Sequence, residues 1–472
     1  MCAFARGDQP GAPYPPDQSS RRVELSDPGL FSGLFAHGDA TAAVSDRALV
    51  DAMVEFEVAL LRALATLELA PVEAADELAD VVERGAVEFD LAELGRGTGQ
   101  QGTPVPALLR ALRRQLSDGA SAYLHKGATS QDVVDTAMML VTRNALDLLV
   151  RDLSAAADAC ASLVTRYRNA IEPGRTLLQQ ALPVTFGLKA AVWLAGIDGV
   201  VADLRALRDR ELAIQFGGAV GTLASLGDRG LDVAGELAGQ LGLPAPAVPW
   251  HTIRLRPARI ACVLGASLGV MGKIGRDVVL LAQTEVAEVS EGGGEGRGGS
   301  STMPHKRNPV GAVGLVACAQ RGPGLVATML GAMTHEHERG AGSWQAEWET
   351  LPALLRLTGS AAGTLKELLE GVEVDPEKMR SDMDLTDGLM MSESVAAALA
   401  PALGRPDAQD LVEKAARRSV DSGRPFRDVL LDVPAVADSL GVDGLDAALD
   451  PGAYLGVTAE LIDRTLAAHR AG

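Results

Sequence analysis

Apolar residues recur at helical spacing along most of the chain. Between Asp46 and Leu69, apolar side chains lie three or four positions apart until Pro71 ends the run: Leu49, Met53, Phe56, Leu60, Leu64 and Leu67. This spacing predicts an amphipathic helix. Further helical stretches follow to about residue 116, so we expect residues 29–116 to form a small N-terminal helical domain after a disordered tail at residues 1–28.

A second helical pattern runs from Ala258 to Val286. Its apolar seam alternates spacings of four and three, with one polar exception: Ile260, Leu264, Ser267, Met271, Ile274, Val278 and Leu281. Four glycines flank the seam: Gly265, Gly269, Gly272 and Gly275. Glycine lowers helix propensity, so we expect a second helix to approach this face closely. We interpret residues 117–367 as a central helical-bundle domain and residues 368–472 as a C-terminal helical domain.

Two other stretches predict helices with less regular boundaries. Pro183 is expected to start a helix that continues to about Leu212. The apolar run from Val310 to Met333 contains Gln320, Arg321 and Pro323, which predicts a buried pair of helices and not a membrane span. Together these patterns predict an all-α fold.

Composition agrees with packed helices and limits the partners. Of the 472 residues, 47% are hydrophobic but only 3% are aromatic, which favours closely packed helices over sheets. The net charge of −19 argues against nucleic acid or an anionic membrane as a partner. The four cysteines, at positions 2, 160, 262 and 318, show no metal-ligand spacing. We expect all four to be reduced and the last three to be buried. The N-terminus shows no apolar leader, so we expect a soluble, cytoplasmic protein.

The segment from Glu291 to Val310 contains the most concentrated chemistry. Six glycines between residues 292 and 299 predict a loop, because each glycine costs backbone entropy and adds no packing. Hydroxyl, cationic and amide side chains follow, and they could hold a carboxylate and place a base beside it: Ser300, Ser301, Lys306, Arg307 and Asn308. A linker with solvated charges is the alternative. The G-x-G-x-x-G pattern in this loop follows a helical pattern and not a strand, so a dinucleotide site is not expected.

The stretch GSSTMPHKRNP resembles the signature GSSxMPxKxN of the fumarase/aspartase superfamily. The resemblance implies that Ser300 is the catalytic base and that Lys306 and Asn308 hold a substrate carboxylate. Ser301 is expected to contact the substrate as well. No cofactor is implied.

A second segment, HKGATSQD at residues 125–132, precedes a long helical run. Exposed N–H groups at a helix start favour an anion, although a simple helix cap is the alternative. The segment also resembles the second superfamily signature. By that resemblance Thr129 and Ser130 bind the substrate carboxylate, and His125 is expected to be a catalytic residue of the active site.

A third segment, GRTLLQQALPVTFGLK at residues 174–189, resembles the third signature region but departs from it. Many relatives have histidine where this chain has Leu177, and cycloisomerases of the superfamily commonly have it where this chain has Gln180. Gln180 can form hydrogen bonds with the substrate, but it cannot exchange a proton near neutral pH. A general acid must therefore come from elsewhere, or none is needed.

Two further residues are expected to contact the substrate. Gln215 opens the glycine-rich stretch QFGGAVGTLASLGD, and Arg254 is one of three arginines within six residues, a cluster that suits a polyanion. Solvated charges at a helix start are the alternative for the arginines. The segment His335-Glu336-His337 does not match H-E-x-x-H, so no metal site is expected there.

Similarity to the bacterial 3-carboxy-cis,cis-muconate cycloisomerases covers the chain from about residue 30 to the end. It implies an all-helical subunit of three domains, a homotetramer with shared active sites, and a small polycarboxylate substrate. Where these enzymes usually have TQRD, this chain has TIRL at residues 252–255. This difference and the missing histidine support a second hypothesis for the function. In this hypothesis the protein is a lyase that releases fumarate from a substituted succinate, such as nitrosuccinate, adenylosuccinate or argininosuccinate. An inactive structural homologue is a third, but intact Ser300, Lys306 and Asn308 argue against it.

Overall fold

The computed structural model describes residues 29–292, 298–299, 302–303 and 305–472. In this part of the chain helices dominate and the few strands are short, which confirms the predicted all-α fold. Seven helices come first: α1 Ser32–Phe35, α2 Asp39–Ala43, α3 Asp46–Thr66, α4 Val72–Glu83, α5 Leu91–Gln101, α6 Val105–Arg113 and α7 Asp118–Ser121.

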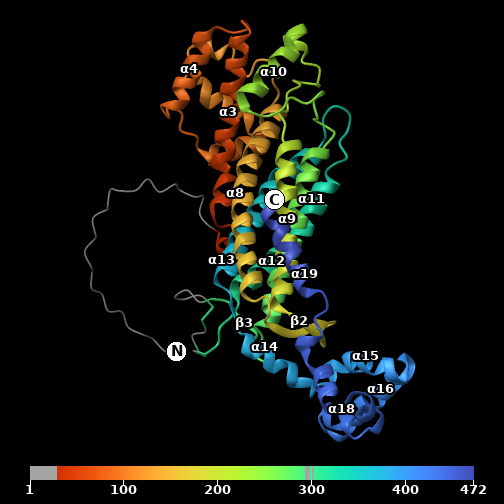
Figure 1. Cartoon of the computed structure of the whole chain (residues 1–472). Helices are drawn as coiled ribbons and strands as arrows, with labels where there is room; N and C mark the ends of the chain where they lie inside the picture. The colour runs from red at the N-terminus through yellow and green to blue at the C-terminus, as the bar shows by residue number, and fades with distance from the viewer. Residues whose placement is uncertain (1–28, 293–297, 300–301, 304) are drawn as a thin grey trace, which may run out of the picture.

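Five long helices form an elongated bundle, which is the body of the molecule in Figure 1: α8 Ser130–Arg166, α9 Phe186–Arg210, α11 Leu255–Leu281, α12 Val310–Gly331 and α13 Ser343–Gly371. The 37 residues of α8 span about 55 Å at 1.5 Å per residue. Helices α3, α4 and α10 (Gly230–Leu241) lie at the end of the bundle where α8 begins (Figure 1). We call this the head end. The short 3₁₀ helix η1, Ala224–Arg229, precedes α10.

The opposite end of the bundle carries two short two-stranded antiparallel sheets, of which β1–β2 is a hairpin. Strand β1 (Ile171–Thr176) pairs with β2 (Gln179–Thr185), and β3 (Val289–Ser290) pairs with β4 (Glu373–Val374). We call this the hairpin end. The segment that resembles the superfamily signature leaves β3 here and leads into α12.

The C-terminal helices form a second, smaller core beyond the hairpins. Buried residues from Val395 to Ala448 make up this core. Its elements are α14 Pro376–Asp382, η2 Met383–Thr386, η3 Leu389–Met391, α15 Ser392–Leu403, α16 Arg405–Ser422, α17 Phe426–Leu431, α18 Pro434–Leu449 and η4 Pro451–Ala453. The last helix, α19 (Thr458–Ala471), returns to the bundle and packs on α9, so that Ile462 is fully buried in the main core. The domain boundaries drawn from the sequence remain predictions.

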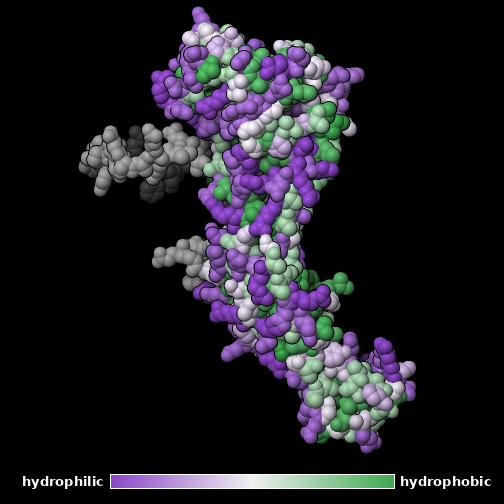
Figure 2. Space-filling model, turned by 45° about the horizontal axis from the view of Figure 1, so that its top comes forward, coloured by the Kyte–Doolittle hydropathy of each residue, from purple (hydrophilic) through white to green (hydrophobic). Residues whose placement is uncertain are grey.

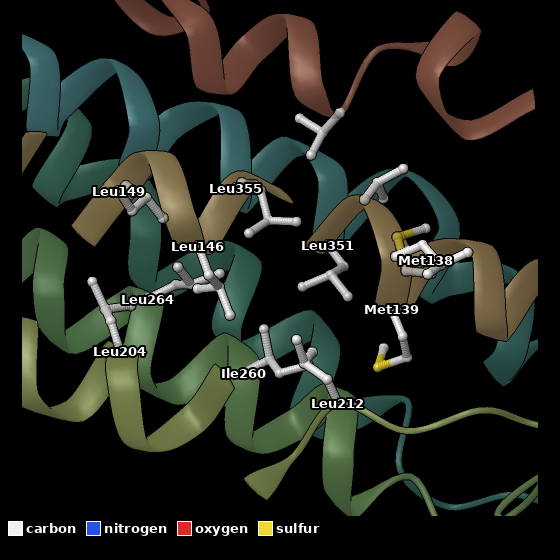
Figure 3. Packing of buried hydrophobic residues seen from close by; sticks show 14 of the residues in the cluster. Met138, Met139, Leu146, Leu149, Leu204, Leu212, Ile260, Leu264, Leu351 and Leu355 are labelled. Carbon is white, nitrogen blue, oxygen red and sulfur yellow. The ribbon is translucent and has the colours of Figure 1, made fainter. Parts of the chain in front are cut away.

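Leucine, isoleucine and methionine side chains fill the main core. Figure 3 shows Met138, Leu146 and Leu149 of α8 facing Ile260 and Leu264 of α11 and Leu351 and Leu355 of α13. The seam predicted for α11 is buried along its length, because all seven seam residues are at most 3% exposed.

Three local predictions were wrong. Pro183 does not start a helix: it lies in β2 opposite Pro173, where a two-stranded hairpin tolerates the missing N–H. The following helix begins at Phe186, after Thr185 Oγ1 accepts a hydrogen bond from Leu188 N–H (3.1 Å). Helix α12 is a single helix that contains Pro323 and not a broken pair. Cys262 is exposed, whereas Cys160 and Cys318 are buried as expected.

Two of the described helices, α11 and α12, are long and apolar enough to cross a membrane by length and composition alone. Buried core helices meet the same criterion, and 56% of the apolar window of α11 is buried inside the subunit. For α12 the buried share is 33%.

Close approach of α12 explains three of the four glycines beside the α11 seam. A Cβ atom at Gly272 would lie 2.2 Å from the Cβ of Ala319, and Cβ atoms at Gly265 and Gly275 would also meet α12 side chains within 3 Å. Gly269 is different, because a Cβ atom added there would have no heavy atom of the described residues within 4 Å.

We therefore expect Gly272→Ala to destabilise the protein by about 1–3 kcal/mol, because a methyl group forces α11 and α12 apart. Thermal or urea unfolding would measure the effect. Gly269→Ala is the matched control and should be neutral or stabilising by up to about 1 kcal/mol through helix propensity. Equal effects of the two substitutions would contradict the proposed role of Gly272.

Candidate active site

The predicted site residues lie in two groups at opposite ends of the bundle. His125, Thr129 and Ser130 immediately precede or begin α8 at the head end. Gln180 of β2, and Lys306 and Asn308 just before α12, lie at the hairpin end. The length of α8 separates the two groups by about 55 Å. Ser300 and Ser301, the predicted base and its neighbour, lie outside the described residues.

Asp132 organises the start of α8. Its Oδ2 accepts hydrogen bonds from the N–H of Thr129 (3.0 Å) and of Gly218 (2.9 Å). Its Oδ1 accepts from Gly217 N–H (3.1 Å) and lies 2.7 Å from Nε2 of His251. Asp132 therefore holds the turn that carries Thr129 and Ser130 against two segments that lie about 85 and 119 positions away in the sequence. Thr129 and Ser130 themselves remain half-buried at the helix start.

Glycine is required where these segments meet. Gly218 has a φ of +68°, and a Cβ atom there would lie 2.9 Å from the carbonyl oxygen of Gly127. At Gly217 a Cβ atom would meet Pro249 and His251 within 3 Å. The glycine-rich stretch after Gln215 thus packs directly against the turn before α8.

Arg254 lies in a buried cluster of charges and not at an open surface. Its guanidinium forms paired hydrogen bonds with both oxygens of Asp135 (2.7 and 2.9 Å) and bonds to Glu347 (2.6 Å). Only 2% of its side chain is exposed. Burial lowers the pKa of Arg254, but the two carboxylates outweigh that effect and raise the pKa overall. The ring of Trp250 covers the guanidinium as well.

Gln215 is also fully buried. Its side-chain oxygen accepts from Trp250 N–H (2.9 Å), and its nitrogen donates to Asp135 (3.4 Å). The roles of Arg254 and Gln215 as substrate ligands remain predictions. In this structure both side chains connect segments of the head end to each other.

His125 faces a carboxylate that the sequence analysis did not single out. Its Nδ1 lies 2.7 Å from Oε1 of Glu57, which is on α3 and has a fully buried side chain. Burial lowers the pKa of His125, but the hydrogen bond and charge of Glu57, together with Asp132, raise it overall. Glu57 occupies a buried position of an otherwise apolar helix face, and a charge at such a position is the signal that could have identified it.

At the hairpin end, Lys306 and Asn308 border a cavity of about 1060 Å³. Lys306, Arg307 and His305 line it from the signature segment, and Glu373, Asp375 and Glu377 line it from β4 and the start of α14. The amide nitrogen of Asn308 donates to the carbonyl oxygen of Gly298 (3.0 Å), which closes the base of the loop. Glu291 accepts hydrogen bonds from Gly311 and Ala312 at the start of α12.

Gln180 is anchored inside the subunit, while the hairpin tip is exposed. The Gln180 nitrogen donates to the carbonyl oxygen of Asp382 (3.0 Å). At the tip, Leu177 and Leu178 both have positive φ angles (51° and 66°) and are 97% and 70% exposed. Two successive non-glycine residues in the left-handed region indicate a strained turn.

A buried ion pair ties this hairpin to the strand before the signature segment. Arg175 of β1 forms two hydrogen bonds with Glu288 (2.7 and 2.8 Å). Nearby, burial raises the pKa of Glu172 to about 7, although Lys189 lies 3.1 Å from its carboxylate. Within the described residues, no group of three or more metal-ligating side chains comes together.

Comparison with known proteins is consistent with this architecture. A family model described as "Lyase" matches residues 38–321, and one described as "Adenylosuccinate lyase C-terminus" matches residues 388–465. The chain therefore belongs to the lyase family, which is part of the fumarase/aspartase superfamily of enzymes. Enzymes of this superfamily act on small-molecule carboxylates.

Individual relatives match over nearly the whole chain. A 3-carboxy-cis,cis-muconate cycloisomerase of Bradyrhizobium diazoefficiens is 44% identical over 93% of this chain and 97% of its own length. A nitrosuccinate lyase of Streptomyces davaonensis is 42% identical over 95% of this chain and 96% of its own length. The crystal structure of 3-carboxy-cis,cis-muconate lactonizing enzyme from Pseudomonas putida superposes with a TM-score of 0.88 at 41% identity, covering 94% and 99% of the two chains.

Substitution of Arg254 distinguishes a structural role of this residue from a role in substrate binding. We expect Arg254→Met to destabilise the protein by about 3–5 kcal/mol, because it leaves Asp135 and Glu347 buried without their common partner. Thermal unfolding measures this effect. Arg259→Met is the control: the Arg259 side chain is 55% exposed, so its ion pair with Glu211 should contribute at most about 1 kcal/mol. Unchanged stability of Arg254→Met, with weaker substrate binding, would instead support Arg254 as a substrate ligand.

Proposed function

We propose that this protein is a cycloisomerase that converts 3-carboxy-cis,cis-muconate or a closely similar polycarboxylate into a lactone. The observation that carries the proposal is the full-length similarity to cycloisomerases, at 44% identity over 93% of the chain in one case. The arrangement of the head end is consistent with it, because the glycine-rich stretch after Gln215 and the segment that carries His251 meet the HKGATSQD segment around the start of α8.

In the proposed reaction, a carboxylate oxygen of the substrate bonds to one carbon of a double bond. A proton adds to the other carbon, which lies next to a second carboxylate. This is the reverse of a β-elimination, and both directions pass through negative charge that builds up on that second carboxylate. Lys306, Asn308 and the N-terminus of α8 beside Thr129 and Ser130 would stabilise that charge. Ser300 would exchange the proton.

The assay is lactone formation by the purified protein. We expect 3-carboxy-cis,cis-muconate to be consumed with lactone as the product, and nitrosuccinate to release no nitrite. Ser300→Ala should lower kcat/KM by about 10²- to 10⁴-fold, because it removes the proposed proton-transfer group. Release of fumarate and nitrite from nitrosuccinate, without lactone formation, would replace this proposal with the second candidate.

The second candidate is a lyase that releases fumarate from nitrosuccinate, and the hairpin tip favours it. Leucines occupy positions 177 and 178, and the side-chain nitrogen of Gln180 donates a hydrogen bond to the carbonyl oxygen of Asp382 within the subunit. A leaving group that departs as a stable anion requires no proton donor, so a tip without histidine suits nitrite. The Streptomyces davaonensis relative is named for this activity.

We further propose that the active protein is a soluble, cytoplasmic homotetramer whose sites combine residues from different subunits. Residues at the two ends of α8 cannot meet within one chain, since about 55 Å separates them. Most of the apolar window of α12 is not buried within the subunit, and Val313 and Leu330 are exposed on it. Figure 2 shows apolar side chains along the middle of the bundle between more hydrophilic regions. Helices of other subunits would cover such a face.

Mixing two inactive variants tests the shared site. Thr129→Ala removes a head-end residue, and Lys306→Ala removes a residue of the hairpin end. We expect activity to reappear when the two variants are dissociated gently, mixed and reassembled, because some sites then receive both native groups. Thr129→Ala treated in the same way alone is the control. Mixed assemblies that are verified by two different tags and remain inactive would contradict shared sites.

A further inference from the structure

The ion pair between His125 and Glu57 joins a predicted site residue to a fully buried carboxylate. The Glu57 side chain is 0% exposed and that of His125 is 17% exposed. The two residues are 68 positions apart, on α3 and in the turn before α8. The only hydrogen bond to the imidazole ring of His125 among the described residues reaches Nδ1, so the opposite ring nitrogen, Nε2, is available to a ligand.

The backbone of His125 adopts a strained conformation. Its φ is +65°, in the left-handed region that non-glycine residues rarely occupy. On either side of it, Leu124 is buried and Lys126 donates to the carbonyl oxygen of Leu69 (3.0 Å). A strained conformation persists only where the surroundings enforce it, and such positions concentrate at functional sites.

The surroundings of Glu57 favour a charged imidazole. Its second carboxylate oxygen, Oε2, is buried and has no hydrogen-bond partner among the described residues. A buried carboxylate with a single partner is stabilised far better by a cation than by a neutral donor. The other charged groups that act on His125 are Asp132 of α8, which favours the charged ring, and Arg113 of α6, which opposes it.

We propose that Glu57 is a positioning residue that fixes Nδ1 of His125 and keeps the ring charged, so that Nε2 donates its proton in a hydrogen bond to a substrate carboxylate. In this arrangement His125 binds an anion and does not act as the base. The proposal rests on the proposed function only for the identity of the ligand, a small polycarboxylate. Thr129 and Ser130 lie four and five positions further along the same turn, at a helix N-terminus that also favours an anion.

The sign of the pH dependence follows from the raised pKa of His125. The ion pair should stabilise the fold fully below the ordinary histidine pKa of about 6.5 and lose this contribution as the pH rises through the higher pKa of the folded protein. Substrate binding should weaken over the same interval, since the imidazole loses its charge.

The test is Glu57→Gln, which keeps the shape and one hydrogen bond but removes the negative charge. Exchange of the histidine C2 hydrogen, followed residue by residue with mass spectrometry, reports the pKa of His125 without requiring any activity. We expect the midpoint for His125 to fall by about one pH unit or more. For whichever substrate is turned over, KM should rise about tenfold while kcat changes by less than about threefold, because binding and not proton transfer is affected.

Glu55→Gln is the matched control, because Glu55 is exposed on the same helix two residues away and carries the same charge. It should leave both the exchange midpoint and KM unchanged. An unchanged midpoint for His125 in Glu57→Gln would overturn the proposal, whatever the substrate proves to be. If the midpoint falls but the wild type forms neither lactone nor nitrite, the proposed function is wrong, while the effect of Glu57 on the charge of His125 is confirmed.

A double-mutant cycle separates positioning from general destabilisation. If Glu57 acts only through His125, Glu57→Gln should have no further effect on KM in a His125→Gln background. Additive effects of the two substitutions would show that Glu57 acts by another route and would also overturn the proposal. Circular dichroism and the melting temperature of each variant establish that the fold is retained.

Discussion

The length of α8 determines how this protein can work. One helix of 37 residues carries the predicted substrate-binding turn at its start and leads into a hairpin at its end. A rigid rod about 55 Å long cannot bring its own ends together. The bundle therefore keeps the two groups of predicted site residues apart within one subunit. This constraint gives the proposed tetramer a purpose beyond stability, since neighbouring chains running in the opposite direction would bring unlike ends together.

Two carboxylates in the first two turns of α8 assemble the head end. Asp132 and Asp135 are three positions apart, so they lie on the same side of the helix and point into the protein. Asp132 binds the glycine-rich turn and His251, while Asp135 binds Arg254 and the indole nitrogen of Trp344 (3.0 Å). Each buried charge is compensated by donors from segments that are distant in sequence. The segments around the candidate site are thus held by electrostatics as much as by apolar packing.

Much of the fold could be predicted from the sequence because helical periodicity is a local property. The helix after Asp46 and the seam of α11 are visible in the spacing of apolar residues alone. The partners of polar residues are not local. Nothing near Glu57 in the sequence indicates His125, and nothing near Arg254 indicates that two carboxylates enclose it. The prediction that Pro183 starts a helix was wrong for a similar reason. Whether this proline begins a helix or lies in a hairpin depends on Pro173, which pairs with it on the opposite strand.

Because α19 returns to the bundle, the C-terminal helices are connected to the bundle at both of their ends. The chain leaves the bundle through α14, builds the small second core and comes back along α9. Asp463 of α19 also forms paired hydrogen bonds with Arg168, just after the end of α8 (2.5 and 2.9 Å). The second core is therefore an insertion with two points of attachment and not a terminal appendage. A body attached to the bundle by two chain connections is more restricted in orientation than one attached by a single linker. Truncation after α18 would therefore remove α19, a helix that packs on the bundle itself.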